Sequence, residues 1–297
     1  MRLLRFDDDG RYSLVEYIGR DSPPPPYAIL SHTWGADHEE VTFKNLVEDI
    51  GKNKVGYRKL GFCAKQAAYD GLQFFWVDTC CIDKSNSVEL SEAINSMFRW
   101  YHNSVKCYVY LSDVATTSSV GIHRLFKESK WFTRGWTLQE LLAPPCVEFF
   151  SKEGDRLGDR DLLAIQIAAI TSIPAEALQG VPLSNIRVEE RMSWARGRAT
   201  KREEDIAYCQ LGIFDIHMPL LYGEGEEKAL KRLRKQIQES ITNESHALSQ
   251  ELSRQQESRG YSDSEDRSRA QHNVVCYKCR CFQCITGNGA SRANCHY

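Results

Sequence analysis

The chain has 297 residues, 42% apolar and 26% charged, which is the composition of a globular protein long enough to bury a core without disulfides or metal. Its 38 basic and 40 acidic residues leave a net charge of −2, which excludes an overall electrostatic drive toward nucleic acid or anionic lipid. No stretch approaches about 18 consecutive apolar residues, and residues 1–9 lack the apolar core of a secretory signal. We therefore expect a cytoplasmic protein without a transmembrane helix.

The first predicted elements follow four consecutive prolines, Pro23–Pro26, which form a stiff extended segment. Short apolar runs bounded by polar residues predict buried strands, and apolar residues at helical spacing predict helices. In chain order these patterns predict a strand over 27–31, a helix over 55–71, a strand over 74–77, a helix over 86–101 and a strand over 106–111.

The next segment predicts a short helix over 136–142, which Pro144 and Pro145 end, and a fourth strand over 146–150. Strands that alternate with helices indicate an α/β fold, with a parallel sheet and helices on both faces. Such sheets bind ligands beyond the carboxyl ends of their strands. The segments to examine therefore come directly after strands, namely 31–35, 78–83 and 111–140.

Residues 160–240 read as helical, and beyond Ser240 the apolar content falls sharply. From Ser245 to Gln271 the large aliphatic residues are Leu248 and Leu252, so this stretch predicts disorder beyond a frayed helix end. The predicted organisation is a lead-in over 1–26, an α/β domain over 27–155, a helical extension over 156–240 and a disordered, cysteine-rich tail over 241–297.

Polar residues after the second strand allow several interpretations. Cys80 could act as a nucleophile with His32, but Asp78 and Asp83 beside it would raise its pKa, which favours packing of a small thiol. The two aspartates could hold Mg²⁺, but no third carboxylate is evident, and a turn in which they accept from backbone N–H groups is favoured.

Glu140 lies about one turn into the predicted short helix, near Trp131, Arg134 and Trp136. One interpretation is a carboxylate stabilised by the helix N-terminus. The other is a carboxylate in an aromatic-walled cleft, whose raised pKa would suit acid–base chemistry or stabilisation of a cationic transition state. The residues alone leave both interpretations open.

Five of the eleven cysteines fall within residues 276–297, whereas the other six are scattered and are typical of free buried thiols. Four of the five form two closely spaced pairs, Cys276, Cys279, Cys281 and Cys284. Thiolates of this kind bind Zn²⁺, but the single residue between the pairs would strain one tetrahedral site. Both a Zn²⁺ site and an unstructured tail remain open.

Three segments resemble the motifs of the heterokaryon-incompatibility (HET) domain of filamentous fungi. The first is Tyr27–Gly35 (YAILSHTWG) followed by Glu40–Phe43, the second is Trp76–Lys84 (WVDTCCIDK) with Glu89 and residues 93–97, and the third is 131–144 (WFTRGWTLQELLAP). Segments 191–195, 204–209 and 218–225 resemble the extension common in that family. The resemblance covers residues 1–240 and leaves out the tail.

The resemblance implies a role in programmed cell death on contact between incompatible strains. HET domains are also regarded as remotely similar to Toll/interleukin-1 receptor (TIR) domains, and residues 136–141 (WTLQEL) resemble the TIR sequence Trp-Cys-x-x-Glu-Leu. In TIR enzymes that glutamate cleaves the nicotinamide–ribose bond of NAD⁺, and here it corresponds to Glu140, with Thr137 in place of the cysteine. The implied fold is TIR-like, with flavodoxin-like strand order.

We therefore hypothesise an effector of fungal non-self recognition that acts as an NAD⁺ nucleosidase (NADase) once it oligomerises. No cofactor or metal would be required, NAD⁺ would be the substrate, and Glu140 would be the catalytic residue. The residues expected to bind the substrate are Ser31, Trp34, Gly35, Asp78, Cys80, Trp131, Arg134 and Trp136. No nucleotide-binding oligomerisation domain or repeat array follows, so the expected sensor is a separate protein. The alternative is a non-enzymatic adaptor that assembles with that sensor.

Overall fold

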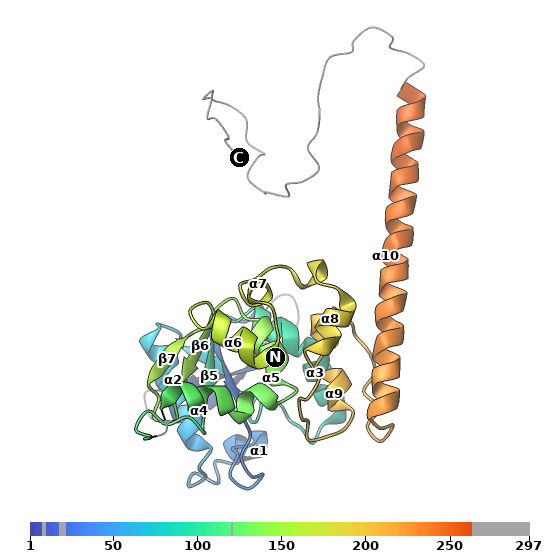
Figure 1. Cartoon of the computed structure of the whole chain (residues 1–297). Helices are drawn as coiled ribbons and strands as arrows, with labels where there is room; N and C mark the ends of the chain where they lie inside the picture. Colours follow the sequence, from blue (N-terminus) through green and yellow to red (C-terminus); the bar gives the residue numbers. More distant parts are fainter. Residues whose placement is uncertain (8–9, 18–21, 120, 263–297) are drawn as a thin grey trace, which may run out of the picture. The chain divides into compact units, whose positions relative to one another are not determined.

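A computed structural model of the chain describes residues 1–7, 10–17, 22–119 and 121–262 (Figure 1). Its contacts divide the chain into two units, Met1–Ile241 and Thr242–Tyr297. The described residues of the second unit all belong to a helix, α10 (Glu226–Ser262), that begins in the first unit. The predicted Zn²⁺ ligands in the tail lie outside the described residues.

The first unit is built on a seven-stranded sheet with the order β2-β1-β4-β3-β5-β6-β7. Its four parallel strands are β3 (Tyr27–His32), β4 (Phe74–Trp76), β5 (Lys106–Tyr110) and β6 (Val147–Phe150). These are the four strands that the apolar runs predict, and all six residues of β3 are buried. The predicted α/β class is confirmed.

The three remaining strands are antiparallel and lie at the edges of the sheet. They are β1 (Arg2–Phe6), β2 (Tyr12–Glu16) and β7 (Arg156–Asp159). A parallel pair needs a crossover of roughly a dozen residues or more. Residues 151–155, between β6 and β7, are too few for one, so β7 returns antiparallel. The segment expected to be a lead-in thus contributes two strands to the sheet.

In chain order, the parallel strands are arranged 2-1-3-4 across the sheet, which is the flavodoxin-like order. The connections after β3 and β5, which are neighbours, lead toward opposite edges. In sheets of this kind the ligand lies beyond the carboxyl ends of the strands at this switch point. The end of β3, at Ser31 and His32, is therefore the place to examine for a site.

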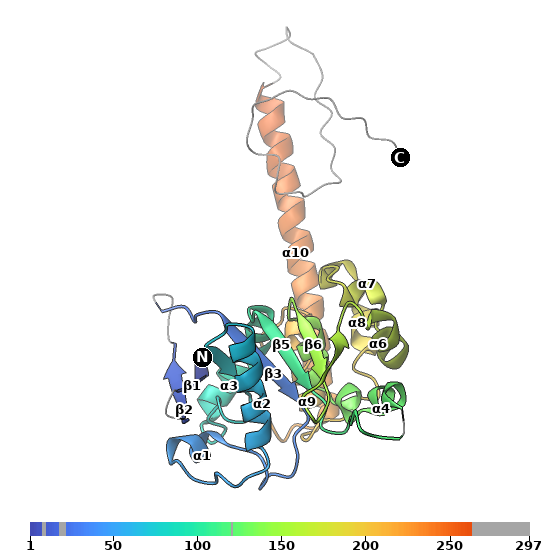
Figure 2. The ribbon, with the colours of Figure 1, turned by 90° about the vertical axis from the view of Figure 1, so that its left-hand side faces the viewer.

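Helices cover both faces of the sheet (Figures 1 and 2). α2 packs against β3 and β4 on one face, whereas α3 and α5 contact each other and α5 contacts β3 on the opposite face. The helices between the strands are α1 (Phe43–Val47), α2 (Tyr57–Tyr69), α3 (Ser87–His102), α4 (Ile122–Glu128), the 3-10 turn η1 (Lys130–Thr133) and α5 (Thr137–Leu142).

The predicted helical extension follows the sheet and packs onto the same core. Its elements before α10 are α6 (Ala164–Thr171), α7 (Ala175–Leu178), η2 (Leu183–Asn185), α8 (Val188–Ser193), α9 (Asp205–Tyr208) and η3 (Leu211–Ile213). Trp76 on β4, Trp131 in η1 and Trp194 in the extension are all fully buried, so these three parts of the chain share one hydrophobic core. None of the described helices is both long and apolar enough to cross a membrane.

Candidate active site

The candidate site is formed where α5 packs against the carboxyl end of β3. Glu140 lies in the first turn of α5 and is 6% exposed, although carboxylates are seldom buried without a specific partner. Its carboxyl group accepts a hydrogen bond from the hydroxyl of Ser31, the fifth residue of β3. Ser31 in turn accepts a hydrogen bond from Nε1 of Trp131, at 2.8 Å. The three side chains form one buried chain of hydrogen bonds.

The environment of Glu140 favours its protonated form. Burial raises the pKa of Glu140 to about 8, and the negative charge of Asp78 adds to this effect. Hydrogen bonds from Ser31 and Tyr101 and the positive charge of Arg134 act in the opposite direction but do not outweigh burial. At neutral pH the side chain is therefore mostly a neutral acid, and a cation brought close to it would favour the carboxylate.

A second polar group surrounds Asp78, which follows β4. The carboxylate of Asp78 lies 3.1 Å from Nε2 of His32 and accepts a hydrogen bond from Nε1 of Trp34 at 2.9 Å. The ammonium group of Lys84 lies 4.0 Å from the same carboxylate and 3.7 Å from the centre of the Trp34 ring. Burial alone would raise the pKa of Asp78, but the Lys84 charge and the bonds from His32 and Trp34 lower it to about 2.

The loop after β3 is held by a buried ion pair between Glu40 and Lys59. Lys59 also donates to the carbonyl oxygen of Thr33 at 2.9 Å, and Glu40 accepts from the backbone N–H of Gly35 at 2.6 Å. These bonds connect both ends of the loop to α2. They hold Trp34 beside Asp78, next to the strand end that carries Ser31.

The structure brings several predicted site residues together and separates others. Ser31 and Trp131 belong to the chain of hydrogen bonds that ends at Glu140. Trp34 is hydrogen-bonded to Asp78 in the second cluster of polar side chains. Cys80 and Trp131 are fully buried, which makes both side chains part of the packing and leaves neither open to a ligand.

The other three predicted binding residues lie at the margins. Gly35 is exposed in the loop after β3, and Arg134 is half-buried in the turn before α5. Trp136 directs its indole N–H to Oδ2 of Asp205 at 3.2 Å, toward the extension. Oδ1 of Asp83 accepts from the backbone N–H and the hydroxyl of Ser85, as the turn interpretation predicts for it. Asp78 departs from that interpretation, because the side chains that bond to its carboxylate lie on other segments. Among the described residues no group of three or more His, Cys, Asp or Glu side chains is placed to hold a metal ion.

Sequence reasoning missed four residues that shape the site, namely Lys59, Lys84, Arg198 and Asp205. Lys84 ends the second motif, so its closeness to Asp78 and Asp83 in the chain was the available signal. Asp205 lies in segment 204–209, whose resemblance to the family extension was a signal for the segment but not for this role. Lys59 and Arg198 carry no local signal, because their partners are distant in sequence.

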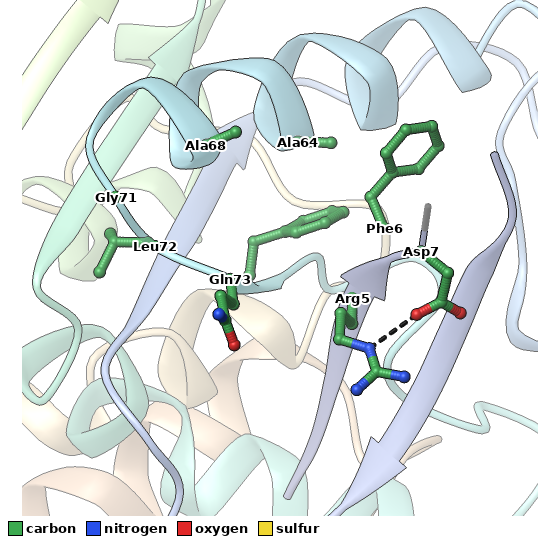
Figure 3. A pocket seen from close by; sticks show the side chains of 9 residues that line it. Arg5, Phe6, Asp7, Ala64, Ala68, Gly71, Leu72 and Gln73 are labelled. Carbon is green, nitrogen blue, oxygen red and sulfur yellow. Dashed lines mark hydrogen bonds and ion pairs between the residues drawn. The ribbon is translucent and has the colours of Figure 1, made fainter. Parts of the chain in front are cut away.

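A separate hollow of about 890 Å³ lies between β1, α2 and β4 (Figure 3). It is lined by Arg5, Phe6, Asp7, Ala64, Ala68, Gly71, Leu72, Gln73 and Phe75. The small side chains of α2 leave this space, and Nε of Arg5 donates to Asp7 at 2.7 Å across its rim. None of the predicted site residues lines it.

Comparison with known proteins places the sequence in a family. Residues 27–127 match the family described as Heterokaryon incompatibility protein (HET). The chain is also 57% identical over 245 residues to the vegetative incompatibility protein HET-E-1 of Podospora anserina. The chain carries a HET domain and belongs to that family. No solved structure matches the chain.

The HET match runs from β3 to α4 and includes Ser31, Trp34, Asp78 and Lys84, whereas Glu140 lies beyond it. The alignment with HET-E-1 covers 80% of this chain but 18% of that protein, so the chain spans less than a fifth of its relative. Because the HET match covers residues 27–127, it confirms the family resemblance of the first and second motifs.

Proposed function

We propose that this HET-domain chain is an effector of heterokaryon incompatibility that hydrolyses NAD⁺ when it self-associates. The observation that carries the proposal is the buried carboxyl group of Glu140, hydrogen-bonded to Ser31 at the carboxyl end of β3. This is the switch point of a flavodoxin-like sheet, where such folds bind ligands. The similarity of residues 136–141 to the TIR sequence supports the same residue.

The proposed reaction breaks the bond between C1′ of the ribose and N1 of nicotinamide. The bonding electrons leave with nicotinamide, a water molecule adds to C1′, and one proton is released, so that NAD⁺ and water give nicotinamide, ADP-ribose and H⁺. Nicotinamide carries a positive charge before it leaves and needs no acid, whereas the ribose acquires positive charge in the transition state. A carboxylate at Glu140 would stabilise that developing charge.

The environment of Glu140 suits this role. The acid is neutral in the free protein because burial raises its pKa to about 8. A bound nicotinamide cation would lower that pKa and generate the carboxylate where positive charge develops. Because Glu140 is 6% exposed, NAD⁺ must be admitted by a rearrangement around α5 or β3. We propose that self-association, triggered in the cytoplasm by a separate sensor protein, drives this rearrangement.

The second candidate is a non-enzymatic adaptor that assembles with the sensor. The observation that favours it is the complete burial of Ser31 and Trp131 around Glu140, since a closed hydrogen-bonded chain of this kind also serves to fix α5 to the sheet. In that case the three side chains would be structural, and killing would depend on surfaces rather than on NAD⁺.

Nicotinamide release from NAD⁺ by the full chain separates the two candidates. The wild type is measured dilute and after forced clustering, together with Glu140→Gln. Glu148→Gln is the matched control, because Glu148 on β6 is also a buried carboxylate but pairs with Lys106 on β5 and Arg156 on β7. Release that appears on clustering and is lost only in Glu140→Gln supports the enzyme. A folded, clustered wild type that releases no nicotinamide supports the adaptor.

A further inference from the structure

The turn before α5 is held by a segment of the extension. The backbone N–H of Ala199 donates to the carbonyl oxygen of Thr133 at 2.6 Å, and the N–H of Gly135 donates to the carbonyl oxygen of Ala199 at 2.9 Å. Together they form a parallel bridge between Arg134 and Ala199. The residues that lead into α5 are therefore fixed by a chain segment that lies outside the sheet and its connecting helices.

Arg198 reinforces the same turn from the side. Its Nη1 donates to the carbonyl oxygen of Arg134 at 2.9 Å and to Oγ1 of Thr137 at 3.2 Å. Its Nε donates to the carbonyl oxygen of Trp194 at 3.0 Å, which anchors the guanidinium in the extension. The Arg198 side chain thus joins Arg134, in the turn, to Thr137, the first residue of α5.

Asp205 holds Trp136, which lies between Arg134 and Thr137 in the chain. Its Oδ2 accepts from the indole N–H of Trp136 at 3.2 Å, and its Oδ1 accepts from the hydroxyl of Tyr222 at 2.9 Å. Asp205 is 7% exposed, and Trp136 directly precedes α5. The carboxylate therefore fixes the N-terminus of α5 against the extension.

The six residues of α5 are too few for a helix to be stable without tertiary contacts. We propose that Arg198 and Asp205 are positioning residues that fix the orientation of α5, so that the carboxyl group of Glu140 meets Ser31. This inference rests on the proposed function of Glu140. On this proposal the helical extension positions the catalytic residue, although neither Arg198 nor Asp205 contacts the substrate.

Positioning by these residues has a kinetic consequence. A misplacement of about 1 Å in a catalytic group can cost about 100-fold in rate. For Arg198→Ala and Asp205→Ala we expect kcat for nicotinamide release by the clustered chain to fall by roughly 10- to 100-fold, with KM for NAD⁺ within about 2-fold of wild type. Asp205→Asn keeps an oxygen that accepts from Trp136 and should recover most of the loss.

Hydrogen exchange of the backbone amides of α5 tests the inference without any catalysis. We expect exchange over residues 138–143 to become at least about 10-fold faster in the two alanine variants, with α2 unchanged. Arg191→Ala is the matched control, because Arg191 also donates to an extension carbonyl, that of Ile213, at 2.8 Å, and its guanidinium lies over the ring of Phe214, so both of these contacts are within the extension. If Asp205→Ala does not fold, Trp136→Phe removes the same hydrogen bond and keeps an aromatic ring.

The outcomes separate this inference from the proposed function. Unchanged exchange in α5, an equal increase in Arg191→Ala, or faster exchange with unchanged kcat would each overturn the positioning role. A clustered wild type that releases no nicotinamide overturns the proposed function and with it the kinetic part of the inference. The exchange result then still shows whether Arg198 and Asp205 hold α5.

Discussion

The hydroxyl of Ser31 donates a hydrogen bond to the carboxyl group of Glu140, 109 residues further along the chain. This bond joins the central strand β3 to α5 and is buried at both ends. Ser31 also accepts from the indole of Trp131, so one hydroxyl satisfies two buried polar groups. Any change at Ser31 must therefore affect both neighbours.

Replacing Ser31 by alanine should destabilise the fold by about 1–3 kcal/mol, because it leaves the indole N–H of Trp131 buried without an acceptor and removes a donor to Glu140. Ser104→Ala is the control, because Ser104 is also buried but donates one hydrogen bond, to the carbonyl oxygen of Tyr101 at 2.8 Å. Urea unfolding of both variants gives the comparison. An equal or smaller loss in Ser31→Ala would contradict the shared role of its hydroxyl.

The raised pKa of Glu140 predicts how stability depends on pH. Burial raises this pKa from 4.5 to about 8, so between these values the folded protein holds a proton that the unfolded chain has lost. The contribution of Glu140 to the free energy of unfolding is therefore fully present below pH 4.5. It falls as the pH rises toward 8, by up to about 1.4 kcal/mol per pH unit.

Glutamine at position 140 cannot ionise, so Glu140→Gln should remove this fall and give a higher free energy of unfolding than wild type at pH 8. Urea unfolding between about pH 5 and 9 measures the effect for both proteins. Glu148→Gln, which alters another buried carboxylate, serves as the control. Parallel pH curves for wild type and Glu140→Gln would show that Glu140 is ionised in the folded protein.

The central strands could be predicted from the sequence because each is an apolar run with polar residues after it. The edge strands could not, since β1 (RLLRF) and β2 (YSLVE) show neither a continuous apolar run nor a strict alternation of apolar and polar residues. They belong to the sheet because β1 pairs antiparallel with both β2 and β4. Four prolines also separate them from β3 in the chain. Their place in the sheet is set by tertiary contact rather than by local pattern.

The same limit applies to the candidate site. Glu140 and Ser31 could be named from motifs, but their contact depends on how α5 packs on β3. Arg198 and Asp205 lie in short turns and helices without periodicity, and their partners in and just before α5 are more than 60 residues away in the chain. Cys80 was predicted to bind substrate because it follows a strand, yet it is fully buried, since its side chain points into the core.

The ion pair between Glu40 and Lys59 should be strongly coupled. Removing one partner of a buried pair leaves an uncompensated charge and typically costs about 3–5 kcal/mol, so Glu40→Gln and Lys59→Met should each be strongly destabilising. The double variant should lose less than the sum of the two. Urea unfolding of the four proteins gives the coupling energy. Additive losses would mean that the two charges do not stabilise each other.

Gly212 and Gly61 should respond in opposite ways to alanine. A Cβ atom at Gly212, in η3, would lie 2.0 Å from Cβ of Phe98 on α3, so Gly212→Ala must push η3 away from α3. A Cβ atom at Gly61, inside α2, would come no closer than 3.8 Å to Tyr12, and alanine there removes the entropic cost of glycine in a helix. In thermal unfolding we therefore expect the free energy of unfolding to rise by up to about 1 kcal/mol for Gly61→Ala. For Gly212→Ala we expect it to fall by several kcal/mol. A Gly212→Ala variant as stable as wild type would mean that the extension does not pack closely on α3.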